Sequence, residues 1–141
     1  MKKRKYTIII ILSILIGTVV IIGLKKYNKP HINVLKAKTD FILTSHELLN
    51  QFTENEDIAN VKYANKIILT KGTIKNIQIN KGKGIITLKG KESTIICELN
   101  KSENDKLSKL NKNQIITIKG ICSGYLMDVL LMNCIIQKSN D

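Results

Sequence analysis

The feature that most restricts this chain is an uncharged stretch of 18 residues, from Thr7 to Leu24. Thirteen of these residues are Ile, Leu or Val. As an α-helix the stretch would be about 27 Å long, close to the hydrocarbon thickness of a bilayer. Tyr6 and Tyr27 stand at its two ends, where an amphipathic ring prefers the membrane interface. The stretch therefore predicts one N-terminal transmembrane helix over residues 7–24 and an integral, single-pass membrane protein.

The residues on both sides of this predicted helix are basic. Residues 1–6 form a basic tail, and residues 25–39 form a basic linker without an acidic residue, which we expect to lie over the lipid headgroups. The two sets of charges nearly cancel under the positive-inside rule, but a large domain translocates largely regardless of its charge. No pattern of small residues typical of a cleavage site follows the helix. We therefore expect an uncleaved anchor in a bacterial cytoplasmic (inner) membrane, with the C-terminal domain extracytoplasmic, or periplasmic.

The pattern changes at residue 40, and we expect residues 40–141 to form one domain. Thr44, followed three residues later by Glu47, forms a capping box that marks a helix start. An apolar stripe follows the cap, formed by Leu48, Leu49 and Phe52. These signals predict a helical segment over residues 44–64, in one piece or in two with a break at Asn55.

Five segments rich in β-branched residues follow, and turns or a short helix separate them. They are residues 66–79, 85–90, 94–99, 113–122 and 126–136. Gly72 in the first segment suggests a bend or bulge, and residues 100–110 predict a short helix capped by Asn100 or Ser102. We expect the last hairpin to turn at residues 123–125. Three strands, a helix and two strands predict a mainly β fold with helices (α+β), a five-stranded OB-fold barrel.

Several stretches of this region are similar to the bacterial tRNA_anti-like family of OB-fold proteins. They are "ANKIILTKGTIKNI", "IICEL", "LNKNQIITIKGICSG" and "DVLLMNCII". The family places a helix carrying A-x-x-K-Y before the first strand, and Ala59 to Tyr63 match it loosely. The resemblance covers residues 44–137 and implies an OB fold but no particular ligand. Asn113 stands where many OB-folds have glycine, and we expect it to adopt the left-handed conformation that asparagine tolerates.

Three cysteines, Cys97, Cys122 and Cys134, lie in the predicted strands with the parity of inward-facing residues. We expect all three to pack as small apolar side chains. The third and fifth strands of an OB barrel run side by side, so Cys97 and Cys134 are the candidate disulfide pair. A plain hairpin would place Cys122 opposite Leu126 and about 26 Å from Cys134, too far for a disulfide.

The sequence contains no recognisable catalytic or cofactor-binding motif. It lacks a C-x-x-C pair, and His31 and His46 are distant from the cysteines, so we expect no metal site. The glycine-containing stretch 80–84 indicates a hairpin turn rather than a phosphate loop, because no helix follows it. Asp128 has no carboxylate partner nearby in sequence, and one acid without a partner is poor evidence for acid–base chemistry. We therefore expect a protein that is not an enzyme and has no cofactor.

Binding is the remaining class of function, and the chain is basic, with 23 Lys and Arg against 11 Asp and Glu and a formal charge of +12. OB-folds bind ligands across their second and third strands and adjoining loops. The lysines of that region, which are the candidate ligand-binding residues, are Lys71, Lys75, Lys81, Lys83, Lys89 and Lys91.

Single-stranded nucleic acid also needs aromatic stacking platforms, and Tyr125 is the only aromatic residue between Lys66 and Asp141. We therefore predict a non-enzymatic binding module in the cell envelope that docks a protein or an anionic glycan. The alternative is a cytoplasm-facing, weak binder of single-stranded nucleic acid or another polyanion. The oligomeric state stays open.

Overall fold

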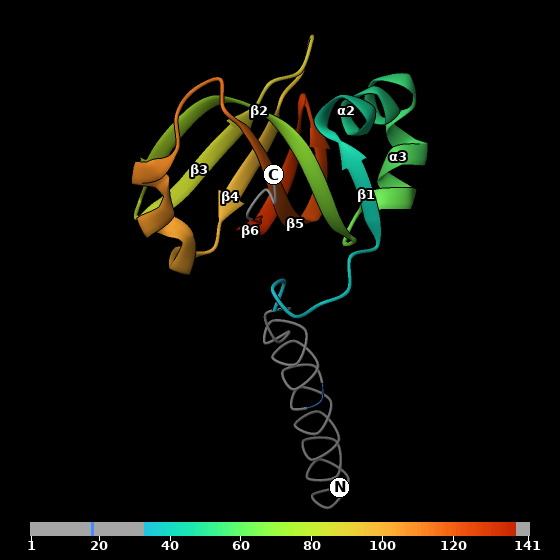
Figure 1. The fold of residues 1–141 in the computed structure, drawn as a ribbon. Helices are drawn as coiled ribbons and strands as arrows, with labels where there is room; N and C mark the ends of the chain where they lie inside the picture. Colours follow the sequence, from blue (N-terminus) through green and yellow to red (C-terminus); the bar gives the residue numbers. More distant parts are fainter. Residues whose placement is uncertain (1–17, 19–32, 138–141) are drawn as a thin grey trace, which may run out of the picture. The chain divides into compact units, whose positions relative to one another are not determined.

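The structure, a computed structural model, describes Thr18 and residues 33–137 (Figure 1). The predicted tail 1–6, most of the predicted membrane helix 7–24 and the first part of the predicted linker lie outside the described residues. Within the part that is described, no helix combines the length and the apolar character needed to cross a bilayer.

Five strands wrap into a barrel. In order around it they are β2 (Ile67–Asn80), β3 (Lys83–Leu88), β4 (Ile95–Leu99), β6 (Asp128–Gln137) and β5 (Ile115–Leu126), and β2 pairs again with β5 to close it. The strand pairs are antiparallel, except that β4 and β6 are parallel. The barrel is therefore the mixed five-stranded OB fold that the order of elements predicts.

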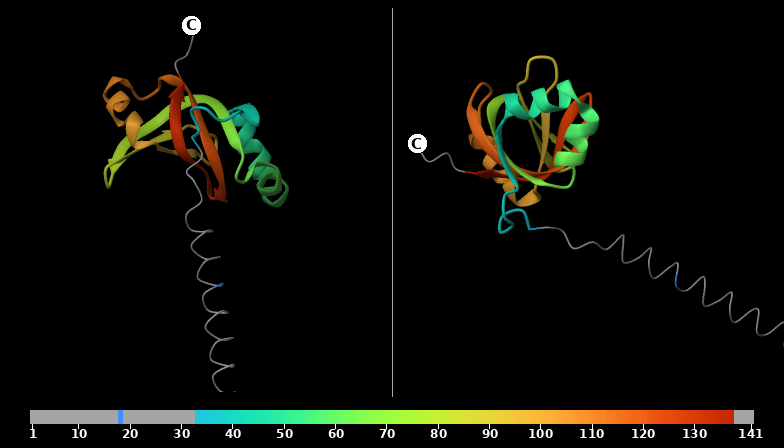
Figure 2. Two further views of the ribbon diagram at one scale, coloured as in Figure 1. Left: turned by 90° about the horizontal axis from the view of Figure 1, so that it is seen from below. Right: turned by 90° about the vertical axis from the view of Figure 1, so that its right-hand side faces the viewer.

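Two helices cover one end of the barrel (Figure 2). They are α2 (Ser45–Glu54) and α3 (Glu56–Tyr63), and Asn55 is both the C-cap of α2 and the N-cap of α3. The predicted capping box forms, with Thr44 Oγ1 accepting from the backbone N–H of Glu47 and the Glu47 carboxylate accepting from the N–H of Thr44. The apolar stripe of α2 is buried in the main hydrophobic core. The predicted helical segment is thus present in two pieces.

The helix between β4 and β5 is a 3₁₀-helix, η1 (Lys101–Lys109), and Asn100 caps it by accepting from the N–H of Ser102. Its inward contact is Leu107, which belongs to the main core. A further hydrogen bond ties η1 to β6, because the Glu103 carboxylate accepts from the backbone N–H of Ile136 at 2.8 Å.

A short strand that was not predicted from the sequence precedes α2. This is β1 (Phe41–Thr44), which pairs with β2 in parallel. The residues before it also contact the barrel, because Val34 is 3% exposed in a small cluster with Ile67 and Ile135. Residues 33–39 are part of the predicted linker; Val34 packs on the barrel, and the position of the segment over the headgroups stays a prediction.

The last hairpin differs from its prediction. The turn lies not at residues 123–125 but at Met127, which has a φ of 69°, and β5 continues to Leu126. Gly124, with a φ of 124°, lies at a bulge instead. Cys122 consequently pairs with Leu131 rather than with Leu126. The irregularity in β2 lies at Lys75, between Ile74 and Asn76, three residues after the bend or bulge predicted at Gly72.

Candidate functional site

The outward surface of β3 and β4 is where OB-folds bind ligands, and here its side chains form two rows. One row runs Asn76, Thr87, Ile96 and Leu130, and the other runs Gln78, Ile85 and Glu98. The strand residues between them point inward and are buried, in the alternating pattern of a barrel wall. These seven residues, together with Lys83, are called the β3–β4 face below.

The β3–β4 face is nearly neutral. Its one lysine, Lys83, lies 2.6 Å from the carboxylate of Glu98, which is the one acidic residue of the face. The remaining members are amides, a threonine and aliphatic side chains. Half-buried Ile85, Ile96 and Leu130 give it an aliphatic character. A surface of this kind suits a protein partner better than a polyanion, which needs unpaired cations.

The other five predicted lysines are exposed, but they do not gather on this face. Lys71 lies on β2 beside Thr117 of β5, and Lys81 is ten residues further on in the β2–β3 turn, about 33 Å along the strand. Lys75 is the residue at the β2 bulge. Lys89 Nζ donates to Asn113 Oδ1 at 2.7 Å.

Lys91 lines a pocket beside α2, and none of the other four lysines lines it. The net charge of the domain is also moderate, with fifteen lysines against ten acidic residues in 33–137. Residues 1–32 carry seven basic residues and no acidic ones, so more than half of the formal +12 lies outside the barrel.

All four aromatic rings of the described chain pack against one another. Phe41 contacts Tyr63 edge-on with centroids 4.9 Å apart, Tyr63 contacts Phe52 at 5.9 Å, and Tyr125 stacks on Phe52 at 5.5 Å. Tyr125, the single candidate stacking platform, therefore has a structural partner on α2. Within the described residues, no aromatic ring is available on the β3–β4 face for a nucleobase.

The three cysteines are buried free thiols, in agreement with their predicted inward parity. Burial raises the pKa of the Cys134 thiol well above its ordinary value, and the neighbouring Cys97 raises it further. The strand register pairs Cys134 with Leu99 and Cys97 with Leu131, so the two thiols are diagonal neighbours.

The register shifts between these two pairs, so regular strand spacing does not give the distance between the two Cα atoms, and the Cys97 thiol is close enough to interact with that of Cys134. The Cys97–Cys134 disulfide therefore stays a prediction.

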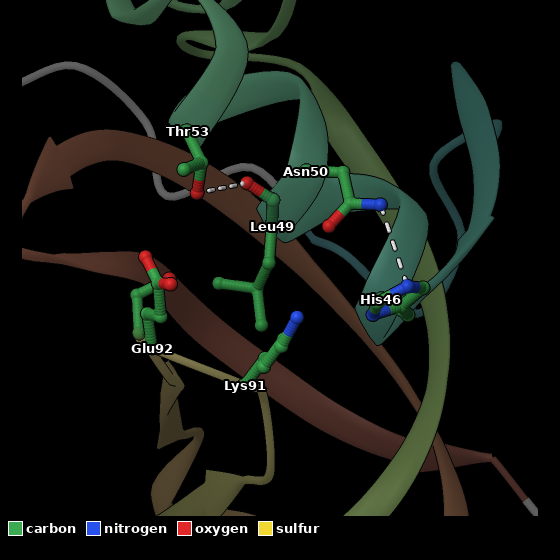
Figure 3. A pocket seen from close by; sticks show the side chains of 7 residues that line it. His46, Leu49, Asn50, Thr53, Lys91 and Glu92 are labelled. Carbon is green, nitrogen blue, oxygen red and sulfur yellow. Dashed lines mark hydrogen bonds between the residues drawn. The ribbon is translucent and has the colours of Figure 1, made fainter.

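A pocket of about 200 Å³ lies between α2 and the loop that joins β3 to β4 (Figure 3). Its lining residues are His46, Leu49, Asn50, Thr53, Lys91, Glu92 and Ser93. We call it the α2 pocket. Sequence reasoning treated His46 as an isolated residue, since only the folded chain brings it near Lys91 and Glu92, which are about 45 positions away.

The carboxylates that could suggest chemistry have structural uses. Asp128 Oδ1 accepts from the N–H and the hydroxyl of Thr94, and Asp40 Oδ2 accepts from the N–H of Ile67. Among the described residues, no group of three or more His, Cys, Asp or Glu side chains is arranged to hold a metal ion.

Comparison with solved structures finds the same fold elsewhere. A Klebsiella pneumoniae protein, named a "putative nucleic acid-binding lipoprotein", matches with a TM-score of 0.60 at 18% identity, over 78% of this chain and 100% of that chain. At this identity the similarity shows the fold alone. No curated protein matches the chain.

Two weaker matches are parts of other proteins. A Schizosaccharomyces pombe Stn1–Ten1 complex matches at 16% identity over 53% of this chain and 59% of that chain, with a TM-score of 0.45. An Entamoeba histolytica aspartyl-tRNA synthetase matches at 11% identity over 71% of this chain and 25% of that chain, with a TM-score of 0.44.

The family comparison agrees with the barrel and with the quoted motifs. The family model described as tRNA_anti-like matches residues 1–136, which is nearly the whole chain. The described barrel has the strand order, the η1 helix between β4 and β5 and the covering helices expected of an OB fold. The chain therefore belongs to the tRNA_anti-like family of OB-fold proteins.

Proposed function

We propose that this chain is a non-enzymatic binding module of the bacterial cell envelope that docks a protein partner through the β3–β4 face. Residues 7–24 anchor it in the cytoplasmic membrane, and the barrel lies on the outer side. The name of the Klebsiella relative supports tethering, since it describes that protein as a lipoprotein. In this chain the apolar stretch takes the place of the lipid.

The observation that carries this proposal is the chemistry of the β3–β4 face. Its single lysine is paired with Glu98, and its centre is formed by Ile85, Ile96 and Leu130. Stacking on an aromatic ring contributes about 1–3 kcal/mol per base to single-strand binding, and the rings of the barrel are engaged with one another. A nucleic acid would therefore gain little binding free energy on this face, whereas a protein surface can cover the aliphatic centre.

Oligonucleotide binding tests this choice of ligand directly. We expect the full chain in detergent to bind fluorescent poly(dT) and poly(rU) weakly, with a dissociation constant of about 100 μM or above at physiological salt, the weak end of non-specific binding. The measurement is fluorescence anisotropy at two salt concentrations. Tight binding that an Ile96→Asp substitution abolishes would contradict the proposal, because it would locate a nucleic acid on this face.

Thiol labelling in intact cells tests the side of the membrane. The three native cysteines are buried, so a single exposed cysteine introduced by Ser108→Cys on η1 would be the reactive one. We expect a membrane-impermeant maleimide to label this variant in intact cells. Protection until the cells are lysed would place the barrel in the cytoplasm.

A second candidate is a cytoplasm-facing, weak binder of single-stranded nucleic acid or another polyanion. Two observations favour it: the surplus of lysine in the domain, and the word "nucleic acid-binding" in the name of the Klebsiella relative. Labelling only after lysis together with steeply salt-dependent oligonucleotide binding would support this candidate over the first.

A further inference from the structure

Two oppositely charged side chains line the α2 pocket without a partner of their own. Lys91 and Glu92 are neighbours in sequence, yet neither forms an ion pair or a hydrogen bond within the described residues. In Figure 3 the ammonium of Lys91 lies on the side of His46 and the carboxylate of Glu92 lies on the side of Thr53, with the Leu49 side chain between them. The pocket therefore has a positive side, a negative side and an apolar floor.

The loop that carries these charges is fixed at both ends. A Cβ atom added to Gly90 would lie 2.2 Å from Leu49 Cδ1 and 2.1 Å from the carbonyl oxygen of Ser93, so only glycine allows the loop to lie this close to α2. At the other end, Asp128 accepts two hydrogen bonds from Thr94 at 2.6 and 2.8 Å. The loop is thus held over the helix by contacts that do not use Lys91 or Glu92.

The polar groups of α2 inside the pocket keep free acceptor capacity. Asn50 Nδ2 lies 3.4 Å from His46 Nε2, and Figure 3 shows the Asn50 oxygen directed into the pocket. Thr53 Oγ1 donates to the carbonyl oxygen of Leu49 at 3.0 Å, which leaves its lone pairs free. These oxygens can accept hydrogen bonds from a cationic group, as the Glu92 carboxylate can.

We propose that the α2 pocket binds a free α-amino acid. The carboxylate of the ligand would receive hydrogen bonds from Lys91, its ammonium would donate to Glu92 with Thr53 and Asn50 nearby, and its side chain would lie on Leu49. Ligand and pocket are then neutral together, and each unpaired charge gains a partner. A volume of about 200 Å³ accommodates a small amino acid. The site is independent of the β3–β4 face.

Three matched ligands test the requirement for both charges. The measurement is saturation-transfer NMR with the full chain in detergent, using L-alanine, N-acetyl-L-alanine and L-alanine methyl ester. We expect L-alanine to bind with a dissociation constant of about 1 mM, which is reasonable for an open pocket. The acetylated compound lacks the ammonium and the ester lacks the carboxylate, so each should bind at least tenfold more weakly.

Substitutions in the loop test the location. Lys91→Gln and Glu92→Gln should each weaken alanine binding about tenfold. Lys112→Gln and Asp105→Asn remove the same charges from exposed positions near or on η1 and should leave binding unchanged. All four positions are exposed, so none of the variants should unfold the barrel.

Three outcomes would overturn the inference. The first is that alanine does not bind at 20 mM, and the second is that it binds equally well to the Lys91→Gln and Lys112→Gln variants. The third is that phosphatidylethanolamine vesicles bind through Lys91 and Glu92 while alanine does not, since the zwitterion recognised would then be a lipid headgroup. None of these results bears on the proposed docking face.

Discussion

At the scale of single residues, backbone conformation and local spacing explain which residue type occupies several positions. Asn113 adopts the left-handed conformation expected where related folds have glycine, with a φ of 69°. The buried parity of the three cysteines, the cap at Thr44 and the break at Asn55 were also predictable, because each depends on local spacing. Of the two candidate caps Asn100 and Ser102, the structure has Asn100. The α2 pocket was not predictable, because nothing in the local sequence relates His46 to Lys91.

Gly90→Ala tests the close approach that forms the α2 pocket. The added Cβ would meet the Ser93 carbonyl and Leu49, so we expect the variant to lose about 1–3 kcal/mol of free energy of unfolding. Chemical denaturation measures this loss. Gly82→Asn is the control, because no atom lies within 4 Å of a Cβ there and asparagine tolerates a positive φ. Equal stability of Gly90→Ala and the parent chain would show that the loop is not held against α2.

The buried thiols predict a pH dependence. Burial raises the pKa of Cys122 and Cys134 in the folded chain, whereas thiols in the unfolded chain ionise near pH 8.5. Because the unfolded state then releases protons that the folded state retains, these thiols make the folded state less stable as pH rises above about 8.5. We expect a Cys134→Ala variant to lose less stability than the parent between pH 8 and pH 10, measured by denaturation. An equal loss would indicate an accessible thiolate.

At the scale of elements, the five barrel strands and both helical segments were predictable, because the apolar residues of each segment recur with the spacing typical of a strand or a helix. β1 was not, since four residues are too few for an alternating pattern and Phe41–Thr44 merge with the helix start. The predicted position of the last turn was wrong because Ser123 and Gly124 are residue types typical of turns. In the structure Gly124 lies at a bulge and the chain reverses at Met127. A turn at a non-glycine residue with positive φ leaves little signal in the sequence.

The capping box of α2 gives a prediction at this scale. Hydrogen bonds from Thr44 lower the pKa of the Glu47 carboxyl below its usual value of 4.5. The stabilisation is therefore present above the unfolded pKa and is lost as pH falls through the lowered folded pKa. We expect Thr44→Ala to cost about 1 kcal/mol at pH 7. The variant should raise the Glu47 pKa only part of the way to its usual value, because it removes the hydrogen bond from the Thr44 hydroxyl but keeps the larger effect of the backbone N–H. Carbon-detected NMR titration of Glu47 measures the shift, and an unchanged pKa in the variant would contradict the assignment.

The segment before β1 gives a second prediction. Lys119 is 6% exposed, and its ammonium donates to the carbonyl oxygen of Ala37 at 2.6 Å. Lys119→Met keeps the aliphatic stem but removes the donor, so we expect a loss of about 1–3 kcal/mol and faster hydrogen exchange around Val34. Exchange mass spectrometry measures the release. Unchanged protection would mean that the apolar contact of Val34 alone holds the segment.

At the scale of the whole molecule, the order of strands and helices was enough to predict the OB barrel, because few closed barrel topologies are compatible with that order. The arrangement of charges on the barrel was not predictable in the same way. Six lysines of the second and third strands and their loops were the candidate ligand-binding residues, and their role stays a prediction; the structure places only Lys83 of the six on the β3–β4 face, paired with Glu98. Which side chains share a face depends on long-range register, which composition does not contain.

Photo-cross-linking in living cells tests most directly whether the β3–β4 face docks a protein. The full chain carries a benzophenone amino acid at Ile96 on the face or, as a control, at Lys112, which is exposed near the start of β5. We predict a discrete protein adduct from Ile96, absent from Lys112 and lost when Ile85 is replaced by Asp. An adduct from Ile96 that nuclease removes, or equal adducts from both positions, would contradict docking of a protein on this face.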